Sequence, residues 1–242
     1  MERPNVIILT PGLSGSSVLT GLVTQAGYWA GDSTFKKEYD TYENLELVQL
    51  NKDLLAQAGC GDNYTFEFSQ QGIDSIAALL GGVAEEPYRT LVEKCNAHRP
   101  WVWKDPRLWL TIRFWAPFLP LDDCKFILLT RHIMHSWTSS ILRRRIVSFG
   151  SLKRYENSIQ DSILSFLGKN GLSSLHVTYE GLIARPDETI EALNAHLNTI
   201  LTVDNLRAVY RGPLYKVPRN SPFEYVKAAM IYLKNYPERA ST

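Results

Sequence analysis

The sequence predicts an α/β fold in which helices flank a central parallel sheet. Short, continuous apolar runs occur at residues 6–9, 126–129 and 175–177, as expected for strands that are buried on both faces. Stretches with apolar residues at helical spacing separate these runs. Strands that alternate with helices form βαβ units, and such units build a parallel sheet.

The first half of the chain predicts one strand and a series of helices. The run at 6–9 is the first strand, and Pro11 with Gly12 ends it. Residues 16–25 have apolar side chains at helical spacing, and Gly27 supplies a stop signal. The same spacing predicts further helices at residues 43–55, 74–80 and 88–98.

The second half predicts three more strands. The run at 101–103 is a strand that Pro106 ends, and the runs at 126–129 and 175–177 complete the sheet. Helical spacing recurs at residues 108–118, 136–145, 152–167 and 187–197. The tail, residues 212–242, contains prolines and basic residues and is expected to form a flap over the site.

The totals predict one globular domain that spans residues 1–242. Hydrophobic residues make up 45% and charged residues 21% of the chain, which is ordinary for such a domain. The net charge of +1 predicts no general attraction to nucleic acid or to a membrane surface. Three widely spaced cysteines form no metal-binding pattern, and no signal peptide or membrane-crossing segment is recognised. We therefore expect a cytoplasmic protein.

The segment PGLSGSS, residues 11–17, has the layout of a phosphate-binding loop. It follows the first strand and opens a helix, where backbone N–H groups can cradle an anion. Gly12 and Gly15 permit positive φ, and hydroxyl donors are available from Ser14, Ser16 and Ser17. A glycine-rich turn with a serine cap would contain the same residue types. The loop is not a Walker A motif, because no lysine follows Gly15.

Cations that the loop lacks occur after two other strands. Lys104 follows the run at 101–103, and Arg131 follows the run at 126–129. The carboxyl ends of parallel strands meet at one edge of a sheet, where ligands bind. We therefore expect Lys104 and Arg131 near the loop. The alternative for Arg131 is a salt bridge at its strand end.

Three stretches, taken together, resemble the sulfotransferases that use 3′-phosphoadenosine 5′-phosphosulfate (PAPS). They are PGLSGSSVLTGL, WVWKDPRLW and FILLTRHIMHSWTSSIL. In that family a loop of the type [RK]SGT[TS] holds the 5′-phosphosulfate, and an Arg followed by a Ser eight residues later holds the 3′-phosphate. Arg131 and Ser139 have this spacing, with Ser140 as an alternative to Ser139. The stretch VTYEGLIARPDETIEALNAHL, residues 177–197, is also similar to bacterial members.

The resemblance covers roughly the whole chain and implies a three-layer, P-loop-like sulfotransferase fold. It implies transfer of the sulfonate of PAPS to a hydroxyl, less often an amine, of a small molecule such as a natural product or a sugar. PAPS is then a co-substrate, no metal is required, and a homodimer stays open. The implied nucleotide contacts are Gly12, Leu13, Ser14, Gly15, Ser16, Ser17, Arg131, Ser139 and Arg219. Arg211 and Lys216 are alternatives to Arg219, and the acceptor is expected at the loops 28–42 and 59–72 and at the tail.

Leu13 departs from the family pattern, which usually has Lys or Arg near the bridging oxygen of the phosphosulfate. Lys104 is the natural substitute, and Arg107 is the second choice. Loss of a charge contact to the transition state costs on the order of 10²–10³ in rate. Two other functions therefore stay open: a P-loop small-molecule kinase, and a catalytically weak homologue that only binds a nucleotide.

A general base is needed to activate the acceptor hydroxyl. Glu43 stands at an expected helix start, where the helix dipole favours the carboxylate, and several carbohydrate-type sulfotransferases look similar there. The alternative is an ordinary acid at a helix start. Asp105 is a rival base, with an ion pair or a helix cap as its alternative. The candidate catalytic residues are thus Glu43, Lys104 and Asp105.

Overall fold

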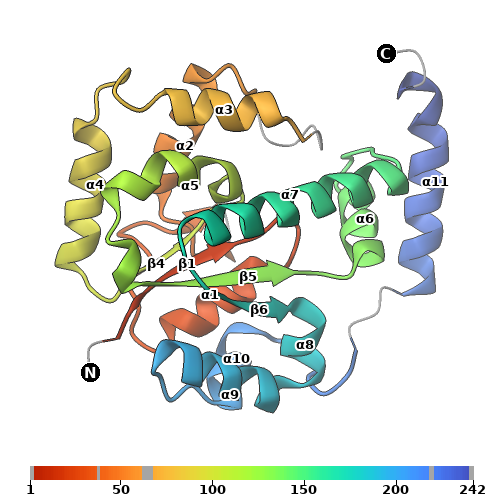
Figure 1. The fold of residues 1–242 in the computed structure, drawn as a ribbon. Coiled ribbons are helices and arrows are strands. Elements are labelled where there is room, and N and C mark those ends of the chain that lie inside the picture. Colours follow the sequence, from red (N-terminus) through yellow and green to blue (C-terminus); the bar gives the residue numbers. More distant parts are fainter. Residues whose placement is uncertain (1–2, 37–38, 62–67, 218–220, 240–242) are drawn as a thin grey trace.

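The computed structural model describes residues 3–36, 39–61, 68–217 and 221–239 and confirms the predicted fold class (Figure 1). Within these residues, four strands form a parallel sheet in the order β4–β1–β5–β6. They are β1 (Asn5–Leu9), β4 (Val102–Lys104), β5 (Cys124–Thr130) and β6 (Ser174–Thr178). A short antiparallel pair, which the sequence did not predict, is formed by β2 (Phe35–Lys36) and β3 (Tyr39–Asp40).

Helices cover both faces of the sheet and make three layers (Figure 1). One face carries α2 (Leu45–Gln57), α3 (Gln70–Ala78), α4 (Glu86–Ala97), α5 (Leu108–Trp115) and α7 (Phe149–Lys169). The other face carries α1 (Ser16–Thr24), α8 (Tyr179–Ala184), α9 (Pro186–Leu197) and α10 (Val203–Val209). Two helices stand beside the sheet, α6 (Ile133–Leu142) and α11 (Pro222–Arg239). Short 3₁₀ turns occur at Ala116–Phe118 and Leu121–Asp123.

The strands are apolar throughout because both faces of the sheet are covered. Successive side chains of a strand point to opposite faces. In β1, Ile7 and Leu9 belong to one core cluster, whereas Val6 and Ile8 belong to the other. The central strand thereby links both helical layers, which holds its carboxyl end in a fixed position.

The second helix begins two residues later than the spacing predicts. The Asn44 side chain accepts hydrogen bonds from the N–H groups of Glu46 and Leu47, at 3.0 and 3.3 Å. Asn44 is therefore the N-cap. Glu43 lies just before the helix, so it is free of the helix register and can point elsewhere.

The tail forms a helix that the sequence did not predict. On α11, Ala228 and Ile231 are buried in a small cluster with Ile141 and Ile146, at the carboxyl end of α6. The sequence predicted a flap over the site, and in the structure residues 222–239 are helical and pack on α6. Arg219, a candidate nucleotide contact, lies outside the described residues.

Candidate functional site

The candidate residues gather where the strand order reverses. From β1 the chain leads first to β4 on one side of it and then to β5 on the other. Ligands of open α/β sheets bind at such a switch point, outside the carboxyl ends of the strands. The loop of residues 10–15 follows β1, Lys104 ends β4, and Arg131 follows β5. The topology thus brings these three features to one edge of the sheet, as the sequence predicts.

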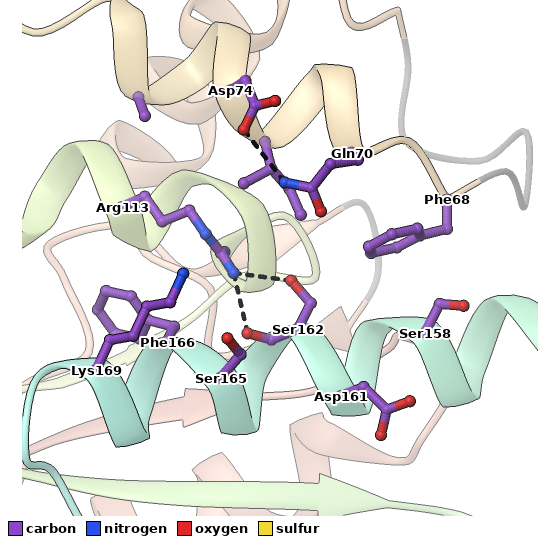
Figure 2. Close-up of a pocket in the computed structure, with 12 residues that line it drawn as sticks. Phe68, Gln70, Asp74, Arg113, Ser158, Asp161, Ser162, Ser165, Phe166 and Lys169 are labelled. Carbon is purple, nitrogen blue, oxygen red and sulfur yellow. Dashed lines mark hydrogen bonds between the residues drawn. The ribbon is translucent and has the colours of Figure 1, made fainter.

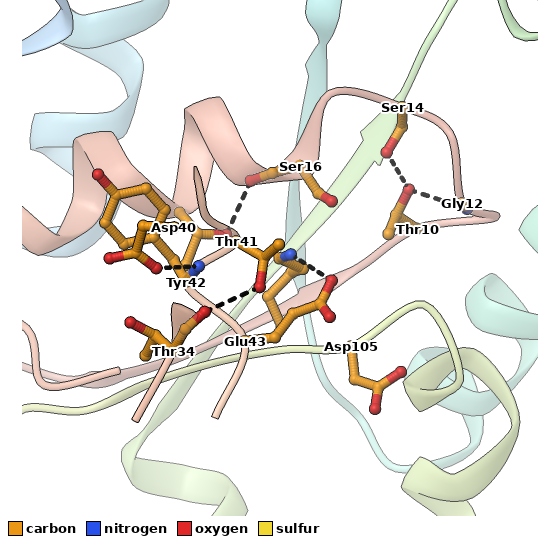
Figure 3. A network of polar contacts seen from close by, with 12 residues as sticks. Thr10, Gly12, Ser14, Ser16, Thr34, Asp40, Thr41, Tyr42, Glu43 and Asp105 are labelled. Atoms are coloured by element: carbon orange, nitrogen blue, oxygen red, sulfur yellow. Dashed lines mark hydrogen bonds and ion pairs between the residues drawn. The ribbon is translucent and has the colours of Figure 1, made fainter. Parts of the chain in front are cut away.

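The loop after β1 is shaped by left-handed backbone at Gly12, Leu13 and Gly15, with φ of 92°, 52° and 76°. Inside the loop, the hydroxyl groups of Thr10 and Ser14 are hydrogen-bonded, and the N–H of Gly12 donates to Thr10 Oγ1 at 3.3 Å (Figure 3). Leu13 packs against the core cluster on the α5 side of the sheet. The side chain at the position where the family usually has a cation therefore supports the core.

The amino end of α1 is suited to an anion. Its N-cap is Gly15, and no side chain among the described residues caps this helix end. The first N–H groups of a helix, here those of Ser16 and Ser17, have no acceptor within the helix. These N–H groups and the positive end of the helix dipole favour a bound anion such as a phosphate or sulfate group.

Arg131 connects the loop with α6. Its Nη1 lies 3.3 Å from the Leu13 carbonyl oxygen and 3.3 Å from Ser139 Oγ. Its Nε is buried without a hydrogen-bond partner among the described residues. The neighbouring hydroxyl, on Ser140, donates to the Arg145 carbonyl at 2.7 Å and so serves the end of the helix. Of the two serines considered, Ser139 is the one that meets Arg131.

Tyr179 contacts two residues of the candidate site, Arg131 and Gly15, and was not predicted from the sequence. The Arg131 Cζ lies 4.9 Å from the centroid of the Tyr179 ring. The ring also lies so close to Gly15 that a Cβ at this position would overlap it. Burial raises the pKa of Tyr179 to about 12. The signal was present in VTYEGL, where Tyr179 directly follows a strand end.

Two acidic residues lie behind Arg131. The Glu180 carboxylate accepts from the His132 N–H at 3.1 Å and lies 2.8 Å from His135 Nδ1, which ties β6–α8 to β5–α6. Glu156 of α7 is buried, and burial raises its pKa to about 7, although Ser136 and Arg131 lower it. In the sequence, Glu156 falls among the apolar residues that form the buried face of a helix. An acidic residue at such a position is the signal that could have identified it.

Glu43 and Lys104 form an ion pair, with Glu43 Oε1 2.7 Å from Lys104 Nζ (Figure 3). The Lys104 side chain is 1% exposed and the Glu43 side chain 14%. Lys104 is paired with Ile8 in the sheet and lies two residues after Val102, so its side chain leaves the sheet on the same face as these two, which α1 covers. Two candidate catalytic residues are thus in direct contact, on the side of the sheet where α1 begins.

Asp105 belongs to a different network. Its Oδ1 accepts from the Arg107 N–H at 2.8 Å and from Arg107 Nη1 at 3.1 Å. Its Oδ2 accepts from Asn51 at 3.1 Å, and Asn51 accepts from the Trp115 indole at 2.8 Å. Asp105 has no exposed surface, and burial raises its pKa while Arg107 lowers it. This arrangement favours the ion pair and helix cap over the catalytic role, and Arg107 is likewise occupied.

A cavity of about 570 Å³ opens between α3, α5 and α7 (Figure 2). Arg113 lines it. Its Nη2 donates to the carbonyl oxygen of Ser162 at 2.9 Å and to the hydroxyl oxygen of the same residue at 2.7 Å. At one end Phe68 stacks on Trp109, with ring centroids 5.7 Å apart. Phe68 lies in the loop 59–72, where the acceptor is expected. The cavity has the size of small-molecule sites, but none of its lining residues is a candidate catalytic residue.

The described residues show neither a metal-binding cluster nor a membrane span. No group of three or more His, Cys, Asp and Glu side chains there could hold a metal ion. No described helix combines the length and the apolar character that a membrane span requires. The expectation that the reaction needs no metal stays a prediction.

Comparison with known proteins supports the fold. No protein-family model matches the chain, and no curated protein matches it. Among solved structures, the chain is similar to a sulfotransferase domain from the curacin biosynthetic pathway, with a TM-score of 0.52. The match covers 93% of this chain and 83% of that domain, at 16% sequence identity. The chain therefore has a sulfotransferase-like fold, and at this identity the likeness extends to the fold alone.

Proposed function

We propose that this chain is a single-domain sulfotransferase that moves the sulfonate of PAPS to a hydroxyl group of a small molecule. The acceptor is a compound such as a natural product or a sugar, and an amine is the less favoured alternative. The fold supports a transferase of this type. The fold does not identify the donor or the acceptor. The proposal adds that the donor is PAPS and that the acceptor is a small molecule with a hydroxyl group.

One observation carries the proposal, namely the position of Arg131 between the loop and Ser139. PAPS carries anionic groups at both ends of its ribose, one a phosphosulfate and one a 3′-phosphate. The uncapped amino end of α1 suits the first, and Arg131 with Ser139 suits the second. The buried Nε–H of Arg131, which has no partner among the described residues, can donate a hydrogen bond to an anion. The residues present therefore fit this nucleotide.

The reaction then needs a base and a cation near the transferred group. In the proposed step, the acceptor oxygen attacks the sulfur in line and a new O–S bond forms. The bond from sulfur to the bridging oxygen breaks, and the electron pair leaves with the 5′-phosphate of adenosine 3′,5′-bisphosphate. Glu43 takes the proton of the acceptor hydroxyl. Lys104, paired with Glu43, balances the charge on the leaving group in place of a cation at Leu13.

The direct test is a screen of hydroxyl-bearing acceptors with PAPS, read by mass spectrometry. We expect an acceptor whose mass increases by one sulfonate group, together with an equal amount of adenosine 3′,5′-bisphosphate. The same screen with Lys104→Met is expected to lose the signal. Formation of a phosphorylated acceptor from Mg²⁺–ATP, with none from PAPS, would contradict the proposal in favour of a kinase.

A second candidate function is binding of the nucleotide without turnover. The packing of Leu13 against the core favours it, because the loop itself then supplies no cation. The variant Leu13→Lys distinguishes an active sulfotransferase from a protein that only binds the nucleotide. If Lys104 substitutes for the missing cation, wild type is active and the variant gains little. Activity that appears only in the variant would identify the natural chain as a binding homologue.

A further inference from the structure

Helix α11 presents an apolar face that no described part of the chain covers. Four of its side chains form this face, and their exposed fractions are 72% for Phe223, 58% for Val226, 67% for Met230 and 69% for Leu233. We call these four residues the α11 stripe. The opposite side of the helix is packed on α6, and Figure 1 shows α11 at the edge of the molecule with α6 as its neighbour.

The spacing of the α11 stripe is that of a helix–helix contact. The four positions are separated by three, four and three residues, so they line one narrow side of the helix, as in the seam of a coiled coil. Large apolar side chains are seldom exposed in such a row, and contiguous exposed patches mark interaction surfaces. The stripe therefore has the form of one half of a helix pair.

We propose that the other half is the α11 helix of a second copy of this chain, in antiparallel orientation. A two-fold axis beside residue 228 places Phe223 opposite the partner's Leu233 and Val226 opposite the partner's Met230. Each large side chain then meets a different one, and all four residues of the stripe are covered. A two-fold interface needs this self-complementarity, because the same surface forms both sides.

The charged residues of α11 fit the same register. The axis brings Glu224 close to the partner's Lys234, and the symmetric pair forms at the other end. Glu224 uses Oε2 to accept from the Ser221 N–H at 2.7 Å, and its second carboxylate oxygen is the one that would bind the partner's lysine. Lys227 lies near the axis, at the solvent edge, where screening keeps the repulsion from its copy small. In a parallel pair Glu224 and Lys234 would each lie level with their own copy, so this pairing of opposite charges would be lost.

The size of the contact is adequate for a dimer. Burial of four large side chains from each copy, each more than half exposed in the single chain, removes on the order of 1,000 Å² from water, where biological interfaces begin. The contact would also brace α6, because Tyr232 of α11 packs against Trp137 of α6 with ring centroids 5.7 Å apart. The inference does not depend on the proposed function.

The test is the oligomeric state of the full chain in solution, measured by sedimentation over a range of concentrations. Wild type is expected to form a dimer, and Met230→Asp is expected to raise the dimer Kd by about tenfold or more, since a charge replaces a central apolar contact. Ile200→Asp is the matched control, because Ile200 is 92% exposed and lies outside the stripe. Circular dichroism checks that each variant is folded.

A charge exchange tests the register. Lys234→Glu is expected to weaken the dimer, and the double variant Glu224→Lys with Lys234→Glu is expected to restore it. A wild-type chain that stays monomeric, or a dimer that Met230→Asp leaves unchanged, would overturn the proposal. So would a monomer that binds anionic lipid vesicles through the stripe, since Lys227 and Lys234 would then serve a different partner.

Discussion

Arg131 Nη1 and the Ser139 hydroxyl lie 3.3 Å apart, although eight residues and the start of α6 separate them in the chain. The contact places the guanidinium over the carboxyl edge of the sheet, and the same nitrogen also reaches the Leu13 carbonyl. Strand β5, helix α6 and the loop after β1 therefore meet at one side chain. The proposed nucleotide site depends on this meeting point.

Neighbouring hydroxyls on α6 should differ in their effect on nucleotide binding. Ser139→Ala is expected to weaken the binding of adenosine 3′,5′-bisphosphate by roughly tenfold, because it removes a hydrogen bond to a charged phosphate. Ser140→Ala is the matched control, since its hydroxyl is used by the Arg145 carbonyl. Titration calorimetry of both variants measures the difference. Equal weakening by the two variants would remove Ser139 from the site.

Removal of Lys104 should damage both stability and rate. Lys104→Met leaves the Glu43 carboxylate without its partner, and loss of one member of a largely buried pair costs about 3 kcal/mol. The double variant Lys104→Met with Glu43→Gln should regain most of the stability, because no unpaired charge is left. Its sulfonate transfer should stay on the order of 10²-fold or more below wild type. Denaturant unfolding measures the stability, and a PAPS assay measures the transfer rate. If the double variant recovered both wild-type stability and wild-type rate, the ion pair would have a structural role alone.

Asp105 should matter for folding. Asp105→Asn removes the buried negative charge that accepts from Arg107, and we expect a loss of about 3 kcal/mol in the free energy of unfolding. Asp123→Asn, which breaks an exposed pair with Arg99, should cost less than about 1 kcal/mol. Folded Asp105→Asn protein should bind adenosine 3′,5′-bisphosphate as wild type does. Unchanged stability together with lost transfer would restore Asp105 as the candidate base.

Glu156 should make stability depend on pH. Its pKa is raised from 4.5 to about 7 in the folded chain, so its contribution is complete below pH 4.5 and is lost as the pH rises towards 7. The loss is about 3 kcal/mol, at about 1.4 kcal/mol per pKa unit. Glu156→Gln cannot ionise and should gain stability relative to wild type between about pH 5 and about pH 8.

Denaturant unfolding at both pH values measures that change. Glu93→Gln serves as the control, because the Glu93 side chain is exposed and its replacement should change stability by no more than about 0.5 kcal/mol. A constant difference for Glu156→Gln would show that Glu156 does not titrate in this range.

Much of the fold followed from local patterns in the sequence. Continuous apolar runs identified the four strands of the parallel sheet, because burial on both faces demands them. The resemblance to a known family paired Arg131 with Ser139, and the two side chains are in contact in the structure. The α/β class and the position of the loop needed no long-range information.

Other features depend on contacts that local patterns do not record. Asp105 and Glu43 look alike in the sequence, yet one is enclosed with Asn51 and Arg107 and the other is paired with Lys104. Asn51 reaches Asp105 because α2 packs against α5, a contact between distant parts of the chain. The helix α11 was missed because prolines at both ends and basic residues resemble a loop, whereas contact with α6 stabilises it.

The central claim is that Arg131 holds one end of a doubly anionic nucleotide. Titration calorimetry of adenosine 3′,5′-bisphosphate into wild type and Arg131→Ala tests it most directly, with the exposed Arg207→Ala as control. We predict binding by wild type and by the control, and a loss of about 100-fold in affinity for Arg131→Ala, as expected for a charged contact to phosphate. No binding by wild type, or equal binding by Arg131→Ala, would contradict the account.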